Sequence, residues 1–161
     1  MSALEQDPRV LCRLFIDRMK QALASSAIEH AWHIDDDEEH CLLELKGTPE
    51  TGFNVDAHVY SDQVMLSAEG WHDHYPATEP LEDFVAEMSG RIRDMLSPAM
   101  RIRERLSLGV PFRWHLENLV DGSWHSESTC GLFFYPWFGT KTEKVFINTV
   151  LPARVQHLSD T

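Results

Sequence analysis

The stretch Phe53–Glu69 reads FNVDAHVYSDQVMLSAE, and apolar and polar residues alternate along it on both sides of a turn at Asp62-Gln63. Such alternation is typical of a β-hairpin that buries one of its two faces. The register that brings all its apolar side chains to one face pairs Ser61 with Val64, Val59 with Leu66, Ala57 with Ala68, and Phe53 with His72. We therefore expect an antiparallel hairpin with one core-facing row of side chains, which His72 continues.

Two amphipathic helices are predicted on either side of this region. The first begins at Asp7-Pro8, a capping carboxylate followed by proline, and ends near Ser25-Ser26. Its apolar face is formed by Val10, Leu11, Leu14, Phe15, Met19, Ala22 and Leu23. The second begins at Thr78-Glu79-Pro80 and ends at Ser97-Pro98. Its apolar face is formed by Leu81, Phe84, Val85, Met88, Ile92, Met95 and Leu96.

Further strands are predicted by the same alternation. They are expected at residues 32–34, 41–46, 100–106, 112–120, 123–129 and 145–151. Asp121-Gly122 is the strongest turn signal, because both residues tolerate the left-handed conformation of a two-residue hairpin. In the strand at 100–106, three arginines are expected to face outward: Arg101, Arg103 and Arg105.

The order helix, strands, helix, strands predicts an α+β fold. We expect a mainly antiparallel sheet with two principal helices packed on one of its faces. The chain contains no internal repeat and no linker, so residues 1–161 are expected to form a single domain.

The composition is that of a soluble, acidic, globular protein, with 43% hydrophobic residues and a formal net charge of −12. A chain of this charge repels nucleic acid and anionic membranes, and no apolar run approaches the ~20 residues of a membrane span. Three widely spaced cysteines without a CxxC pattern, Cys12, Cys41 and Cys130, favour a reducing compartment. The N-terminus lacks a signal-peptide pattern, so we expect a cytoplasmic protein.

His72 and His74 are the best candidates for metal ligands, because residues two apart on a strand point to the same side. No other histidine has ligand spacing, and the predicted register places His72 in the core. Structural packing is therefore favoured, with His72 mostly buried, His74 less so, and a ring nitrogen of one of them bonded to the backbone near Pro76–Leu81.

A small hydrolase is a further alternative, but the sequence contains no nucleophile motif. Cys130 and His125 lie five residues apart on one strand and therefore on opposite faces. The sequence thus indicates no catalytic residue, no metal site and no cofactor.

Charge and aromatic residues point instead to protein binding. Residues 29–62 contain ten carboxylates and a single lysine, Lys46. This excess of negative charge would steer a basic partner. The segment Cys130–Gly139 contains five aromatic residues, which suit either a core strand or an exposed contact loop. The candidate partner-binding residues are Asp35, Asp36, Asp37, Glu38, Glu39, Trp137 and Phe138. Trp71 and Trp124 are also expected on faces turned away from the core.

Four short motifs carry a resemblance to a known group of proteins. They are Trp71-His72-Asp73-His74-Tyr75, Phe84-Val85, Ser89-Gly90-Arg91 and Asp121-Gly122-Ser123-Trp124. Together they resemble small bacterial proteins, some of which are encoded beside polymorphic toxins and are taken to be their immunity proteins. The resemblance implies a non-catalytic domain that binds one folded toxin domain.

The layout alone is also similar to type III secretion chaperones, which dimerise and bind effector segments. This alternative implies a dimer that holds an extended peptide of an effector protein.

Overall fold

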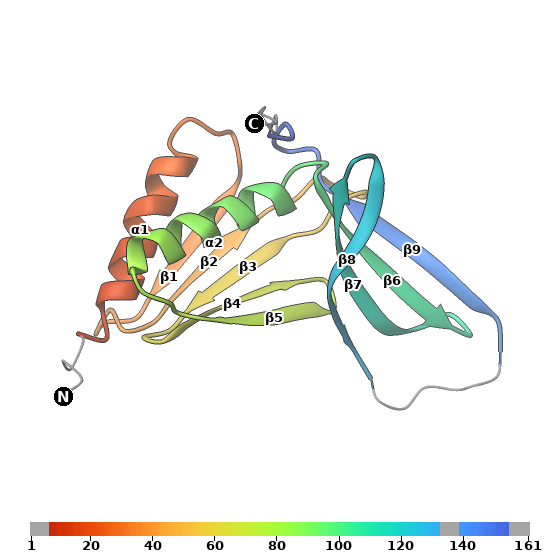
Figure 1. The fold of residues 1–161 in the computed structure, drawn as a ribbon, viewed down its shortest axis with the longest axis horizontal. Helices are drawn as coiled ribbons and strands as arrows, with labels where there is room; N and C mark the ends of the chain where they lie inside the picture. The colour runs from red at the N-terminus through yellow and green to blue at the C-terminus, as the bar shows by residue number, and fades with distance from the viewer. Residues whose placement is uncertain (1–6, 133–138, 155–161) are drawn as a thin grey trace.

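The computed structural model describes residues 7–132 and 139–154, which form two helices and two antiparallel sheets (Figure 1). The helices are α1 (Val10–Leu23) and α2 (Leu81–Met95). The five-stranded sheet runs in the order β1 (His30–Ile34), β2 (Cys41–Leu45), β3 (Val55–Val59), β4 (Gln63–Ala68) and β5 (Trp71–Pro76). The four-stranded sheet runs in the order β8 (Ser123–Gly131), β7 (Val110–Val120), β6 (Met100–Ser107) and β9 (Lys141–Ile147). The predicted α+β class with mainly antiparallel sheet is confirmed.

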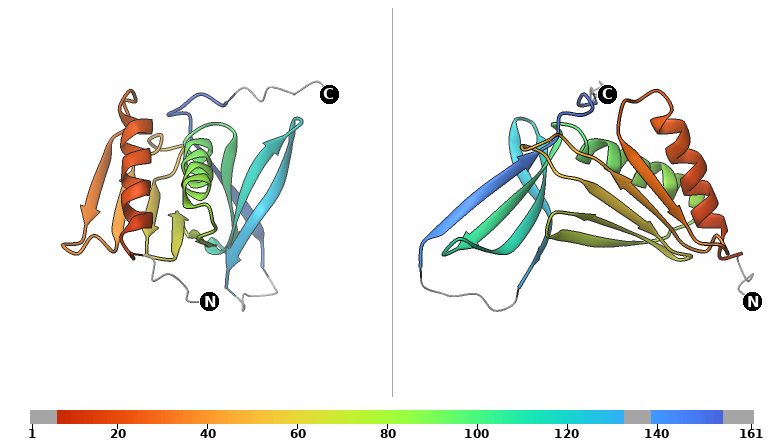
Figure 2. Two further views of the ribbon diagram at one scale, coloured as in Figure 1. Left: turned by 60° about the vertical axis from the view of Figure 1, so that its left-hand side comes forward. Right: turned by 180° about the vertical axis from the view of Figure 1, so that it is seen from behind.

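Both helices cover the same face of the five-stranded sheet, and the main core lies between these two layers (Figures 1 and 2). In β2 and β3 every second residue is buried, as the alternation of apolar residues predicts. Phe15 of α1 and Trp71 of β5 are among the largest side chains that are fully buried. The opposite face of this sheet carries no helix in the described part of the chain (Figure 2).

The hairpin β3–β4 buries the predicted face, but its register differs from the predicted one by two residues. Val59 pairs with Val64 and Ala57 pairs with Leu66. The turn consists of Ser61-Asp62, because the N–H of Tyr60 bonds to the carbonyl of Gln63 at 2.9 Å. A shift of two residues preserves the face of every side chain, so the burial pattern could not reveal it.

The prediction that His72 belongs to the core row is wrong. The chain reverses after Ala68 in a two-residue turn at Glu69-Gly70, and β5 is a separate strand paired with β4. Because Ala68 pairs with Trp71, Trp71 takes the core-facing position and His72 and His74 take the outer face. Trp71 is fully buried, and both histidines are exposed. Their expected bonds to the backbone at 76–81 are not formed: each ring contacts a side chain instead.

The four-stranded sheet extends from the end of the five-stranded sheet near the C-terminus of α2, and the two sheets meet at an angle (Figure 2). The hairpin β7–β8 turns at Asp121-Gly122, both with positive φ, as predicted. The last strand, β9, occupies Lys141–Ile147 instead of 145–151. Most of β9 is exposed, so no hydrophobic alternation marks its beginning.

A buried amide at the end of β9 joins the two sheets. The side chain of Asn148 is fully buried and lies between the β2–β3 loop and the end of α2. Its Oδ1 accepts hydrogen bonds from the N–H of Thr48 (2.8 Å) and of Phe53 (3.2 Å). Its Nδ2 donates to the carbonyls of Phe53 (2.9 Å) and Met95 (3.0 Å). One side chain thus satisfies four backbone groups of three residues, which belong to the β2–β3 loop and to the end of α2.

A second junction links β5 to β8. The indole N–H of Trp71 donates to Ser128 Oγ at 3.3 Å, and the Ser128 hydroxyl donates to Asp73 Oδ2 at 2.6 Å. Gly70 is required here, because a Cβ at this position would lie 2.2 Å from the ring of Trp114.

The outer face of the four-stranded sheet carries the predicted arginines of β6, but they are paired. Glu117 of β7, whose side chain is 5% exposed, accepts hydrogen bonds from Nε of Arg101 and Nε of Arg103, each at 2.7 Å. Arg103 also reaches Glu143 at 2.9 Å. Burial would raise the pKa of Glu117, but the bonds from Arg103 and Arg101 outweigh it and hold the pKa below its usual value. Trp124 lies on this face under Arg101, so its predicted orientation is confirmed, whereas that of Trp71 is wrong.

Candidate functional site: the acidic end

Four chain segments bring carboxylates to one end of the molecule. They are the start of α1, the β1–β2 turn, the β3–β4 turn and the start of α2, which lie together in Figure 1. The carboxylates of this acidic end are Asp7, Asp35, Asp36, Asp37, Glu38, Glu39, Asp62, Glu79, Glu82 and Asp83. The basic residues in the same segments are Arg9 and Arg13.

The local structure of each segment favours acidic residues. Glu82 and Asp83 lie in the first turn of α2, where the positive end of the helix dipole stabilises carboxylates. In the β1–β2 turn, the N–H of Glu38 bonds to the carbonyl of Asp35 at 2.9 Å, and the N–H of Glu39 bonds to Asp37 Oδ1 at 3.1 Å. The side chain of Asp37 therefore stabilises the backbone of this turn, in addition to carrying negative charge.

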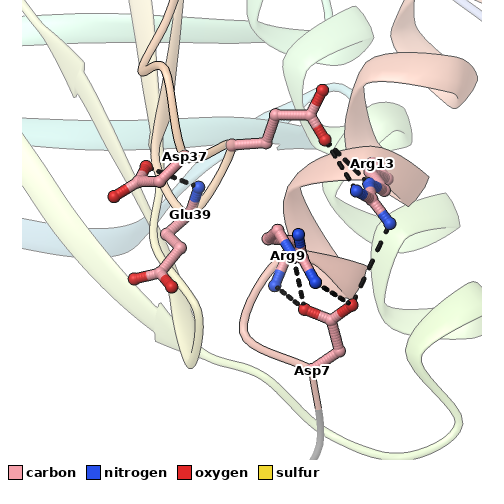
Figure 3. A network of polar contacts seen from close by, with 6 residues as sticks. Asp7, Arg9, Arg13, Asp37 and Glu39 are labelled. Carbon is pink, nitrogen blue, oxygen red and sulfur yellow. Dashed lines mark hydrogen bonds and ion pairs between the residues drawn. The ribbon is translucent and has the colours of Figure 1, made fainter.

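Part of this charge is neutralised within the molecule (Figure 3). Asp7 pairs with Arg9 at 2.8 Å, and the hydrogen bonds from Arg9 hold the pKa of Asp7 below its usual value. Arg13 reaches from α1 to Glu38 of the β1–β2 turn, also at 2.8 Å. Asp35 lies 3.3 Å from the ring of His40.

Three carboxylates of the turn remain available. Asp36, Asp37 and Glu39 are exposed, and within residues 7–132 and 139–154 no ion pair engages them. In Figure 3, Asp37 and Glu39 lie apart from the ion pairs of α1. The acidic end therefore presents an excess of negative charge beside the ion pairs of Arg9 and Arg13.

A cleft of about 490 Å³ lies between the start of α1 and the β1–β2 turn. It is lined by Asp7, Pro8, Arg9, Arg13, Asp36, Asp37, Glu38 and Glu39. A smaller hollow of about 180 Å³ adjoins it and includes the apolar side chains of Val10, Leu11 and Leu81. An arginine or lysine side chain suits such a place, because its aliphatic stem packs on apolar atoms while its charge meets carboxylates.

The structure describes one of the two parts of the predicted partner-binding surface. Asp35, Asp36, Asp37, Glu38 and Glu39 form the β1–β2 turn at the acidic end. Trp137 and Phe138 lie outside the described residues.

Sequence reasoning counted Asp62 among the steering carboxylates without placing it beside Asp35–Glu39, and it missed the contributions of Asp7 and the first turn of α2 to this site. These residues are far from Asp35–Glu39 in the chain, and only the strand order places them beside it. The helix-start signals at Asp7-Pro8 and Glu79-Pro80 were the one indication, since both imply a helix N-terminus with acidic neighbours.

The histidines proposed as metal ligands do not form a metal site in the described part of the chain, where no group of three potential ligands converges. His74 Nδ1 lies 3.2 Å from Gln63 Oε1. His72 Nδ1 lies 3.5 Å from Cys130 Sγ, a contact between the two sheets that strand spacing could not predict. His125 and Cys130 pair with Asn118 and Trp114 respectively, so the two side chains remain separated along β8.

Histidines gather on the helix-free face of the five-stranded sheet. The outward positions of its strands and turns include His33, His40, His58, His72 and His74. The rings of His40 and Tyr60 stack with centroids 4.8 Å apart, and His58 stacks beside both. Burial and the neighbouring His40 lower the pKa of His58.

Comparisons with known protein families, curated proteins and solved structures find no match for this chain. Within the described residues, neither helix is long and apolar enough to cross a membrane.

Proposed function

We propose that this chain is a non-catalytic cytoplasmic protein that binds a basic protein partner through its acidic end. The observation that carries this proposal is the cleft between α1 and the β1–β2 turn, in which five carboxylates outnumber Arg9 and Arg13. A basic side chain of the partner would enter this cleft and compete with the internal arginines for Asp7 and Glu38.

The exposed carboxylates that lie outside ion pairs would increase the rate of association with the partner. Asp36, Asp37 and Glu39 are exposed at the acidic end and take part in no ion pair of the described structure. Exposed charges of this kind accelerate encounter with an oppositely charged protein, and their effect decreases as salt screens them. Association should therefore depend on salt much more strongly than dissociation does.

The resemblance of the sequence motifs to immunity-type proteins gives the partner a class. The partner would be a folded, basic toxin domain, and binding at the acidic end would block the surface that the toxin uses. A secretion-chaperone role is the alternative, in which the protein is a stable dimer and binds an extended effector segment.

Isolation of the partner from the native host, followed by kinetics with the purified pair, tests the proposal. Asp36→Asn, Asp37→Asn and Glu39→Gln together should slow association by on the order of tenfold or more at low salt, with a smaller change in dissociation. The matched control neutralises three exposed carboxylates elsewhere, Asp17→Asn, Glu29→Gln and Glu50→Gln, and should retain most of the association rate. Equal loss in both triple variants would show that net charge alone acts and that the acidic end is not the site.

The oligomeric state separates the immunity and chaperone alternatives. Sedimentation of the free protein should give a monomer, and the partner should bind as a folded domain. A stable dimer that binds an unfolded segment of the partner with equal affinity would favour the chaperone role.

The non-catalytic class has its own test. Elemental analysis of protein purified without a histidine tag should find no stoichiometric metal. Stoichiometric zinc or iron that is lost in a variant with His72→Ala and His74→Ala would contradict this class.

A further inference from the structure

A groove separates the C-terminal halves of the two helices on the side away from the five-stranded sheet. It has a volume of about 470 Å³ and is lined by α1, by α2 and by Leu151 and Arg154 of the chain that follows β9. The N–H of Leu151 bonds to the carbonyl of Leu96 at 2.9 Å, which holds this last segment against the end of α2 (Figure 1).

The floor of the groove is apolar. Met19 and Leu23 of α1 and Ile92 and Leu96 of α2 line it, and all four are buried. Small residues on its walls leave space between the helices: Ala22, Ala86 and Gly90. An apolar hollow of this size lies within the range of ~300–1,000 Å³ that is typical of small-molecule sites.

The rim of the groove is basic, although the chain as a whole is acidic. Arg18, Arg93 and Arg154 line it, and its described lining includes no carboxylate. Arg154 bonds to Asp94 (Nε to Oδ1, 2.9 Å) and to the carbonyl of Gly90 (3.3 Å). Arg18 and Arg93 are exposed, and in the described part of the chain no ion pair engages them. The chain as a whole has a net charge of −12, so two arginines outside ion pairs beside an apolar floor give this groove a local preference for anionic ligands.

We propose that this groove binds a small apolar carboxylate, with its hydrocarbon body on the floor between the helices and its carboxylate at Arg18 and Arg93. A guanidinium group binds a carboxylate through two parallel hydrogen bonds, so the rim recognises the charge and the floor recognises the hydrocarbon. Leu151 and Arg154 form one wall of the groove. Its volume of about 470 Å³ suits a small molecule.

Calorimetric titration with a matched pair of ligands tests the proposal. Decanoate and decylamine carry the same hydrocarbon chain and opposite charges, and both are used below their aggregation concentrations. Decanoate should bind with one site per chain, and decylamine should bind at least about tenfold more weakly, since one charge-assisted contact is worth roughly 1.4 kcal/mol or more. Equal binding of the two ligands, or binding of neither, would overturn the proposal.

Three variants locate the site. Arg18→Ala with Arg93→Ala should weaken decanoate binding by on the order of tenfold or more. Lys20→Ala, which removes an exposed charge of α1 outside the groove, should leave decanoate binding unchanged. Ala86→Leu narrows the groove and should weaken binding while the thermal midpoint remains close to that of the parent protein.

An acidic amphipathic peptide serves as the competing occupant. If such a peptide binds the groove and decanoate does not, the occupant is a protein helix and the proposal is wrong. If decanoate binds but the double arginine variant retains full affinity, the ligand lies elsewhere and the assignment of the groove is wrong.

Discussion

The two sheets use charge in opposite ways. The four-stranded sheet, which no described helix covers, ties its arginines to Glu117 and Glu143 on its outer face. The five-stranded sheet buries its inner face under α1 and α2 and leaves Asp36, Asp37 and Glu39 unpaired at one end. The arginines of β6 are therefore held in ion pairs on the first sheet, whereas these three carboxylates of the second are not.

The difference follows from how each sheet gains stability. Apolar burial beneath two helices contributes roughly 1.5–3 kcal/mol for each large side chain, and this burial stabilises the five-stranded sheet. The four-stranded sheet has one exposed face and an exposed edge strand, β9. Its paired charges and its bonds to the five-stranded sheet replace the missing layer. Each of the following predictions breaks or sharpens this comparison.

Removal of the amide that joins the sheets should have the largest effect. Asn148→Ala leaves buried backbone groups of Thr48, Phe53 and Met95 without partners. We expect a loss of about 3–5 kcal/mol in the free energy of unfolding, measured by urea denaturation. Thr149→Ala, at the exposed neighbour, is the control and should lose less than about 1 kcal/mol. A small loss in Asn148→Ala would mean that the sheets are joined by other contacts.

Removal of the ion pairs on the four-stranded sheet should have the second-largest effect on stability. Glu117→Ala removes the nearly buried carboxylate that bonds to Arg101 and Arg103, and should destabilise the protein by about 2 kcal/mol. Glu143→Ala, whose carboxylate is 48% exposed, should lose less than about 1 kcal/mol. Equal losses in the two variants would contradict the structural role of Glu117.

Acidification should destabilise the protein through two histidines. Burial lowers the pKa of His58 and of His115 below the usual 6.5, so the unfolded chain binds more protons than the folded one as the pH falls through this range. Stability should therefore decrease from pH 7 toward the folded-state pKa values. A variant with His58→Gln and His115→Gln should lose less stability over this interval than the parent. A steeper pH dependence in the variant would contradict the direction of these shifts.

Thiol accessibility should distinguish the two sheets. Cys12 and Cys41 are fully buried between α1 and the five-stranded sheet, whereas Cys130 of β8 is partly exposed. An aromatic disulfide reagent should titrate one thiol in the native protein and three in denaturant. Cys130→Ser should abolish the native reaction. Rapid reaction of two or more thiols in the native state would show that the helix layer opens readily.

Neutralisation of the exposed carboxylates in the β1–β2 turn should have the smallest effect on stability. The triple variant Asp36→Asn, Asp37→Asn and Glu39→Gln changes exposed side chains only, so the free energy of unfolding should change by less than about 0.5 kcal/mol per site. An increase is expected if mutual repulsion in the turn outweighs its local hydrogen bonds. A large loss would mean that these carboxylates are structural and would remove the contrast between the sheets.

The sequence predicted the elements better than it predicted their neighbours. Helical spacing placed α1 and α2 closely, because an amphipathic stripe depends only on residues a few positions apart. The β3–β4 register was wrong by two residues, since either register buries the same face. The turn at Glu69-Gly70 was missed, and that omission alone reversed the faces of Trp71 and His72.

The candidate site shows the same division. The acidic turn at Asp35–Glu39 was evident from its composition, and the structure confirms that it is an exposed turn between two strands. Its arginine partner Arg13 and its neighbour Asp7 were not predicted, because the contacts cross between α1 and the β1–β2 turn.

The amino-acid sequence by itself determined the α+β class, the two helices, the hairpin turn at Asp121-Gly122 and the excess of negative charge. These properties depend on local conformational preference and on composition, and both can be read from neighbouring residues. The tertiary structure alone decided that the strands divide into two sheets, that Asn148 joins them and that arginines rim a groove between the helices. Those properties depend on which distant segments meet, and the hydrogen bonds and apolar contacts that decide this form only when the whole chain is packed.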